Sequence, residues 1–177
     1  MRNLFTVIIL GIALVGVSFG QGAARGTAPK LAVVEFSPGA NASGMTDQAK
    51  RGLQSQLSAR LNHTRKFDVY DTRHTRNASQ SGLAAINGAS TAAAVRVGKQ
   101  LGVAFVLTGT VTEYNTGGSA TAKFRLVEVA TGKVRHSGEI SQSATMKMTG
   151  NAAAAEMQAK VMKPLIDKLT NSMTTAF

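Results

Sequence analysis

The residues of this sequence that most clearly suggest a function are its cations, because Lys and Arg number 20 against 9 Asp and Glu. The formal net charge is +11, and a basic surface of this kind attracts an anionic partner. With no Trp and only two Tyr, the chain is poor in the aromatic residues that stack on bases, so no nucleic-acid partner is expected. The cations that we predict to form an interaction surface are Arg60, Arg65, Lys66, Arg73, Arg76, Lys123, Arg125, Lys133 and Arg135. A solvated basic face is the alternative interpretation.

The other reactive side chains form no catalytic or metal-binding pattern in the sequence. The chain has no cysteine, and His63, His74 and His136 fall in different predicted elements with no helical partner. Neither a phosphate-binding glycine loop nor a G-x-S-x-G motif occurs. Among the scattered acids, Glu35 ends a predicted strand and is expected to pair with a neighbouring cation. We therefore predict a protein that is not an enzyme and needs no cofactor or metal.

The elements that position these side chains follow from hydrophobic periodicity. Leucines and alanines four residues apart predict a helix over 46–62, and apolar runs predict buried strands at 30–36 and 103–114. The N-T-G-G-S stretch at 115–119 predicts a hairpin turn, while Ser37-Pro38-Gly39 reads as a turn followed by a loop. The remaining predicted elements are a strand at 67–71, a loop with a short helix at 72–90, a helix to Leu101 capped by Thr91, strands at 121–130 and 133–146, and a helix at 151–173 interrupted at Pro164. Lys123 with Arg125, and Lys133 with Arg135, are two apart and should share a face. The fold class predicted is α/β, with one mixed sheet of about five strands, flanking helices and a C-terminal helix.

The first residues have the pattern of an export signal. Arg2 precedes an uncharged apolar stretch from Leu4 to Phe19, and small residues at Ser18 and Gly20 suit signal peptidase. We predict a signal peptide over 1–20, with cleavage after Gly20 or, alternatively, after Ala24. A flexible leader over 21–29 and one domain over 30–177 follow. The apolar stretch would rise only about 24 Å as a helix, so an uncleaved membrane anchor is the lesser alternative.

Four segments resemble the CsgG/LpoB-type envelope proteins, which include the curli secretion channel and a penicillin-binding-protein activator. They are LAVVEF at Leu31–Phe36, KFDVYDTR at Lys66–Arg73, KQLGVAFVLTGTVTEY at Lys99–Tyr114 and FRLVEVATGKVRHSGE at Phe124–Glu139. The segments keep the family's order over most of the domain, so the resemblance implies the family's fold. Two features depart from the family: no cysteine is available for lipidation, and the Asn115–Ser119 turn is too tight for a membrane-spanning hairpin. The chain thus resembles the family's periplasmic domain without its membrane parts.

The resemblance implies a non-enzymatic, exported cell-envelope protein that acts by contact with another envelope protein, either a cell-wall synthase or a secretion assembly. Its expected location is periplasmic or associated with the outer membrane, without lipidation. Two alternatives stay open. One is an oligomeric outer-membrane channel subunit of the curli type. The other is a basic periplasmic protein that binds polyanions such as cell-wall polymer or lipid headgroups.

Overall fold

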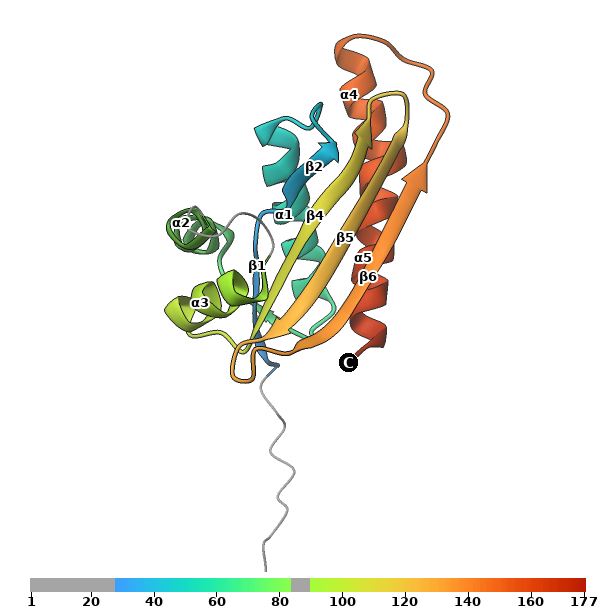
Figure 1. The fold of residues 1–177 in the computed structure, drawn as a ribbon. Helices are drawn as coiled ribbons and strands as arrows, with labels where there is room; N and C mark the ends of the chain where they lie inside the picture. The colour runs from blue at the N-terminus through green and yellow to red at the C-terminus, as the bar shows by residue number, and fades with distance from the viewer. Residues whose placement is uncertain (1–27, 84–89) are drawn as a thin grey trace, which may run out of the picture.

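The computed structural model describes residues 28–83 and 90–177, which form one mixed sheet with helices on both faces (Figure 1). The predicted fold class is confirmed, with six strands in place of about five. The strands are β1 (Lys30–Val33), β2 (Ser37–Asn41), β3 (Asp68–Val69), β4 (Phe105–Asn115), β5 (Ser119–Glu128) and β6 (Val134–Ser143). The helices are α1 (Asp47–His63), α2 (Thr72–Leu83), α3 (Thr91–Leu101), α4 (Asn151–Met157), the π-helical turn η1 (Gln158–Met162) and α5 (Lys163–Thr175).

The sheet runs in the order β3-β1-β4-β5-β6, with β1 parallel to both β3 and β4 and the last three strands antiparallel. β2 pairs in parallel with the second half of β4, beyond the point where β1 ends. The turn and loop predicted at 37–44 are therefore wrong for Ser37–Asn41. Pro38 is tolerated because β2 has a ladder partner on one side only, where a missing N–H costs little.

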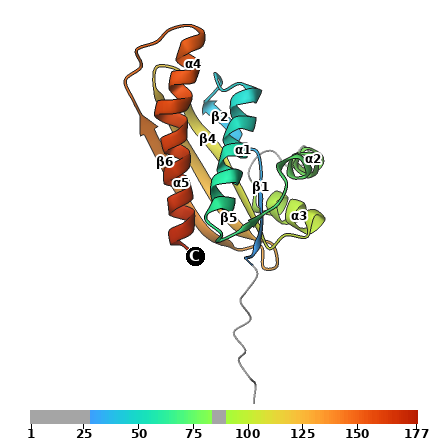
Figure 2. The ribbon, with the colours of Figure 1, turned by 180° about the vertical axis from the view of Figure 1, so that it is seen from behind.

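Two hydrophobic clusters lie on opposite faces of the sheet. α1 and α5 pack side by side on the first face, as Figure 2 shows from behind. The predicted apolar stripe of α1 is buried there through Leu53, Leu57 and Leu61. α2 and α3 lie on the second face, where they pack on β1 and on parts of β4 and β5. The rest of the second face, over β4, β5 and β6, has no helix on it (Figure 1).

Several predicted boundaries shift, each for a local reason. α2 begins at Thr72, separated from the end of β3 by two residues, because Asp71 caps it. Residues 84–89 of the predicted loop lie outside the described residues. The cap of α3 is Ser90 rather than Thr91, since the Ser90 hydroxyl accepts a hydrogen bond from Ala93 N–H at 3.1 Å. The predicted strand at 67–71 is reduced to β3.

The C-terminal helix departs from α-helical geometry just before Pro164, where a kink or break was predicted, but it does not end there. The N–H of Lys163 bonds to the carbonyl of Gln158, five residues earlier, so the turn just before the proline is a π-turn. In a regular α-helix the Pro164 ring would clash with the carbonyl of Lys160, and the wider turn removes that conflict. The helix therefore continues along β6 instead of ending.

The predicted signal peptide over 1–20 and most of the predicted leader over 21–29 lie outside the described residues. Within 28–83 and 90–177, no helix combines the length and the apolar character that a membrane crossing requires.

Candidate interaction surfaces

The uncovered part of the sheet carries two of the predicted cations. Lys123 and Arg125 project from β5 on the side away from α5, between partner residues of β4 and β6. We call this surface the open face; its central members are Thr110, Lys123, Arg125, Ser137 and Glu139. The predicted alternation of Lys123 and Arg125 is confirmed, because both are exposed and residues 122, 124 and 126 are buried on the other face.

A shallow hollow of about 470 Å³ lies between the two cations of the open face. Gly109 and Gly138 flank Phe124 across the three strands, so backbone forms the floor of this hollow. The Lys123 ammonium is 3.7 Å from the Glu139 carboxylate, with both side chains more than half exposed. An exposed pair of this kind is worth little, so it does not prevent Lys123 from contacting an anionic partner.

The second predicted group of cations does not form a surface with the first. Arg76 of α2 lies 3.7 Å from the carboxylate of Glu35, and both side chains are less than a quarter exposed. Its Nη2 also donates to Gln54 Oε1 at 3.2 Å, and Gln54 Nε2 donates to the Val33 carbonyl at 2.8 Å. The expected ion pair of Glu35 is therefore confirmed. Val33 lies on β1 beyond the residues that pair with β3, and this network supplies a hydrogen-bond donor to its carbonyl.

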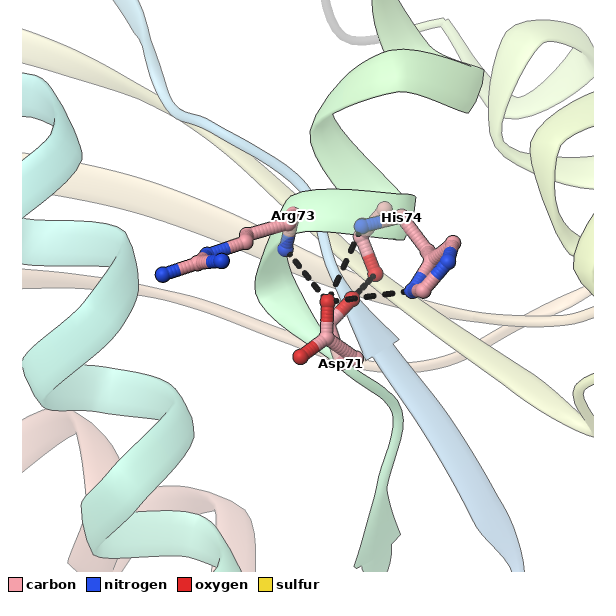
Figure 3. Close-up of polar contacts among 4 residues, drawn as sticks. Asp71, Arg73 and His74 are labelled. Carbon is pink, nitrogen blue, oxygen red and sulfur yellow. Dashed lines mark hydrogen bonds and ion pairs between the residues drawn. The ribbon is translucent and has the colours of Figure 1, made fainter.

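Asp71 in the K-F-D-V-Y-D-T-R segment has a structural role that Figure 3 makes visible. Its Oδ1 accepts the backbone N–H of Arg73 at 2.8 Å and of His74 at 3.0 Å, and it is 3.2 Å from His74 Nδ1. The hydrogen bond from the His74 backbone holds the pKa of the Asp71 carboxyl below its ordinary value. The Arg73 guanidinium points away from Asp71 (Figure 3). Asp71 thus starts α2, and Arg73 is an exposed cation on its first turn.

The remaining predicted cations lie near the end of the sheet where β1, β3 and β4 begin. Arg65 and Lys66 precede β3, while Lys133 lies in the turn before β6. The predicted alternation of Lys133 and Arg135 along one strand is wrong, because the register between β5 and β6 shifts on either side of Arg135. Arg60 is ion-paired with Asp167 of α5 at 3.2 Å. The nine predicted cations are thus divided among separate places.

A groove that the sequence analysis missed lies between the first turns of α1 and α4. Its volume is about 670 Å³, and its lining contains no charged residue. Small residues on the facing helices, including Ala49, Gly52 and Ala153, leave this space, and Tyr114 borders it with a pKa raised by burial. Small residues at helical spacing are the only sign of this groove in the sequence. They face one another only because the chain returns after β6 and places α4 opposite α1.

No chemical centre emerges among the described residues. Within 28–83 and 90–177, no cluster of three or more His, Cys, Asp and Glu side chains could hold a metal ion. His63 and His74 are exposed, while the ring of His136 contacts that of Phe124 and lies 3.0 Å from the Ser172 hydroxyl.

These features define an α/β domain with one face of its sheet covered and the other partly open. No protein-family model and no curated protein matches the chain. Among solved structures, lipoprotein GNA1162 from Neisseria meningitidis is similar at a TM-score of 0.53 and 19% identity, over 81% of this chain and 98% of that one. A PelC dodecamer from Paraburkholderia phytofirmans is similar at a TM-score of 0.52 and 16% identity, over 81% of this chain and 89% of that one.

The resemblance stated from the sequence is supported in part by a third structure. LpoB from E. coli is similar at a TM-score of 0.50 and 18% identity, over 63% of this chain and 56% of that one. The chain therefore has an LpoB-like fold and matches little more than half of that protein's length. The resemblance to the curli secretion channel stays a prediction.

Proposed function

We propose that this chain is an exported cell-envelope protein that acts by binding another protein through its open face. The observation that carries the proposal is the uncovered surface of β4, β5 and β6, with Lys123 and Arg125 on either side of a backbone-floored hollow. The LpoB-like fold supports it, because the family that the sequence resembles includes an activator of a cell-wall synthase. A cell-wall synthase is accordingly the first partner class and a secretion assembly the second.

The open face is physically suited to an acidic protein surface. Its side chains stand on paired strands, so the backbone is already ordered before a complex forms and only side-chain entropy is lost. Two cations two residues apart on β5 complement carboxylates, and the neighbouring Thr110 and Ser137 offer hydroxyl groups. Charge complementarity at an exposed face raises the rate of association, and the interaction weakens with salt.

Site-specific cross-linking tests this proposal. A photoreactive residue replaces Ser137 on the open face, and the matched control carries it at Gln100, an exposed position on α3. The expected result is a cross-link at position 137 to one acidic envelope protein, lost in Lys123→Ser/Arg125→Ser and absent at position 100. Equal cross-linking at both positions would overturn the proposal.

A second candidate is a subunit of a homo-oligomeric envelope assembly. The similarity to a PelC dodecamer favours it, since that protein assembles as twelve copies of a comparable fold. Light scattering of the purified protein, with and without detergent, distinguishes the two. A mass near the 18.4 kDa of one chain, or twice that, in both conditions leaves the protein-binding proposal standing. A large, detergent-dependent assembly favours the oligomer and the related channel alternative.

The basic polyanion-binding alternative has its own signature. Binding that falls steeply with salt and is equally strong for chemically different polyanions would replace the protein-binding proposal. Binding that depends on the identity of one protein partner retains it.

A further inference from the structure

One end of the domain is defined by a row of backbone hydrogen bonds across the sheet. Asp68 N–H bonds to the Pro29 carbonyl at 3.1 Å, and Ala104 N–H bonds to the Lys30 carbonyl at 3.0 Å. Val129 N–H then bonds to the Ala104 carbonyl at 2.9 Å. The starts of β1, β3 and β4 and the turn between β5 and β6 therefore lie at one end of the sheet, the lower end in Figure 1.

This end carries exposed cations from five separate segments. They come from the start of β1, the loop before β3, the last turn of α3, the turn before β6 and the first residues of β6. We call them the basic end: Lys30, Arg65, Lys66, Lys99, Lys133 and Arg135. No ion pair involves these six within the described parts of the chain, whereas Lys50 and Lys160 at the opposite end are paired with Asp47 and Glu156.

The negative charges at the basic end are fewer than its cations. Asp68 is exposed, and Glu128 accepts a hydrogen bond from the Thr131 hydroxyl. The six exposed cations thus outnumber these two anions.

The N-terminal part of the chain joins the domain at this same end. The uncharged apolar stretch from Leu4 to Phe19 is separated from residue 28 by residues 20–27. Eight residues reach at most about 28 Å when fully extended. A membrane that holds the apolar stretch, during export or afterwards, therefore lies within about 28 Å of the basic end.

We propose that the basic end binds an anionic lipid surface and stands the sheet on it, with its strands directed away from the membrane. Each cation near such a surface contributes a factor of about five in binding, and the effect fades within a Debye length of about 8–10 Å. Lys123 lies five residues before the end of β5, about 17 Å away, and Arg125 lies three residues before it, about 10 Å away, so the open face contributes less than the basic end. The proposal stands apart from the protein-binding function, since it uses different residues.

Vesicle sedimentation tests the proposal on the protein as isolated from the envelope. Vesicles of phosphatidylcholine alone are compared with vesicles of phosphatidylcholine and phosphatidylglycerol, and the ratio of the two binding constants is measured. Taking this ratio cancels any contribution of an apolar N-terminal segment, which inserts into both. The wild-type ratio is expected to be large and to fall steeply as salt is added.

The variant Lys30→Gln/Lys66→Gln/Lys133→Gln is expected to lower this ratio about a hundredfold, from about fivefold for each cation. The matched control, Arg51→Gln/Lys147→Gln/Lys163→Gln, changes the net charge equally at exposed positions away from this end. It is expected to lower the ratio less than about fivefold. Equal losses in both variants, or no wild-type preference for the anionic vesicles, overturn the proposal, and circular dichroism checks that each variant is folded.

Discussion

Gly109 occupies a tightly packed position in the sheet, and replacing it tests how β4 packs against the core and against β5. The ring of Phe36 packs over this glycine on the face that α1 and α5 cover, and Phe124 pairs with it on β5. A Cβ atom at position 109 would lie 2.7 Å from Cδ1 of Phe36. It would lie closer still to Cε1 of that ring and to the Lys123 carbonyl.

The expected cost of Gly109→Ala follows from which of these atoms can move. Overpacking a core with an added methyl group costs about 1–3 kcal/mol. The Phe36 ring can rotate, but the Lys123 carbonyl belongs to the β5 ladder and cannot withdraw without breaking strand pairing. We therefore expect a loss near the upper limit, about 3 kcal/mol in the free energy of unfolding. For a domain of this size that corresponds to a fall in Tm of about 6–12 °C.

Urea unfolding followed by far-UV circular dichroism measures this loss, with Gly52→Ala as the matched control. A Cβ at Gly52 meets no heavy atom within 4 Å, and the residue lies inside α1. The same glycine-to-alanine change should stabilise the protein there by about 0.5–1 kcal/mol. The packing argument fails if Gly109→Ala unfolds within about 0.5 kcal/mol of wild type, or if Gly52→Ala costs as much.

Two further changes test the other networks. Gln54→Leu removes the hydrogen bond that the Val33 carbonyl accepts and the one that Arg76 Nη2 donates, and it should cost about 1–3 kcal/mol in urea unfolding, whereas Gln100→Leu, on an exposed part of α3, should change little. Glu156 accepts the N–H groups of Lys147 and Met148, and the hydrogen bond from Lys160 is the main cause of its pKa falling to about 2. Because its folded pKa lies below the unfolded value of 4.5, its contribution is present above pH 4.5 and lost as the pH falls toward 2. Glu156→Gln should therefore unfold more easily than wild type at pH 7, with the difference closing in that window; a difference that is constant with pH would contradict this.

The elements that the sequence predicts well are those whose signal is local. The leucine spacing of α1, the apolar first half of β4 and the glycine turn between β4 and β5 all lie within a few residues of the structure they specify. β2 is different, since Ser37-Pro38-Gly39 has the local signature of a turn. It becomes a strand only because β4 extends past β1 and offers an unpaired edge. Pairing between distant segments decides such cases.

The same limit applies to the candidate interaction residues. The sequence identifies the cations but cannot say which share a surface, because neighbours in sequence end in different surroundings. Arg73 and Arg76 lie three residues apart on α2, yet one is exposed and the other is held by Glu35 and Gln54. Lys133 and Lys30 are far apart in sequence, yet the hydrogen-bond row through Ala104 brings them to one end. Composition therefore indicates an anionic partner, and topology decides where it binds.

Because the cations are divided between an open face and a basic end, we predict that protein binding and vesicle binding can be removed independently. Lys123→Ser/Arg125→Ser should abolish the cross-link at position 137 and lower the preference for anionic vesicles by less than about fivefold. The triple glutamine variant of the basic end should do the reverse. Sites more than about 10 Å apart with no shared partner have additive effects, so the combined variant should show both losses at their separate sizes. Cross-linking and vesicle sedimentation on all three variants measure this. Should either set of changes weaken both activities to the same extent, one continuous basic surface binding polyanions would describe the molecule better than two.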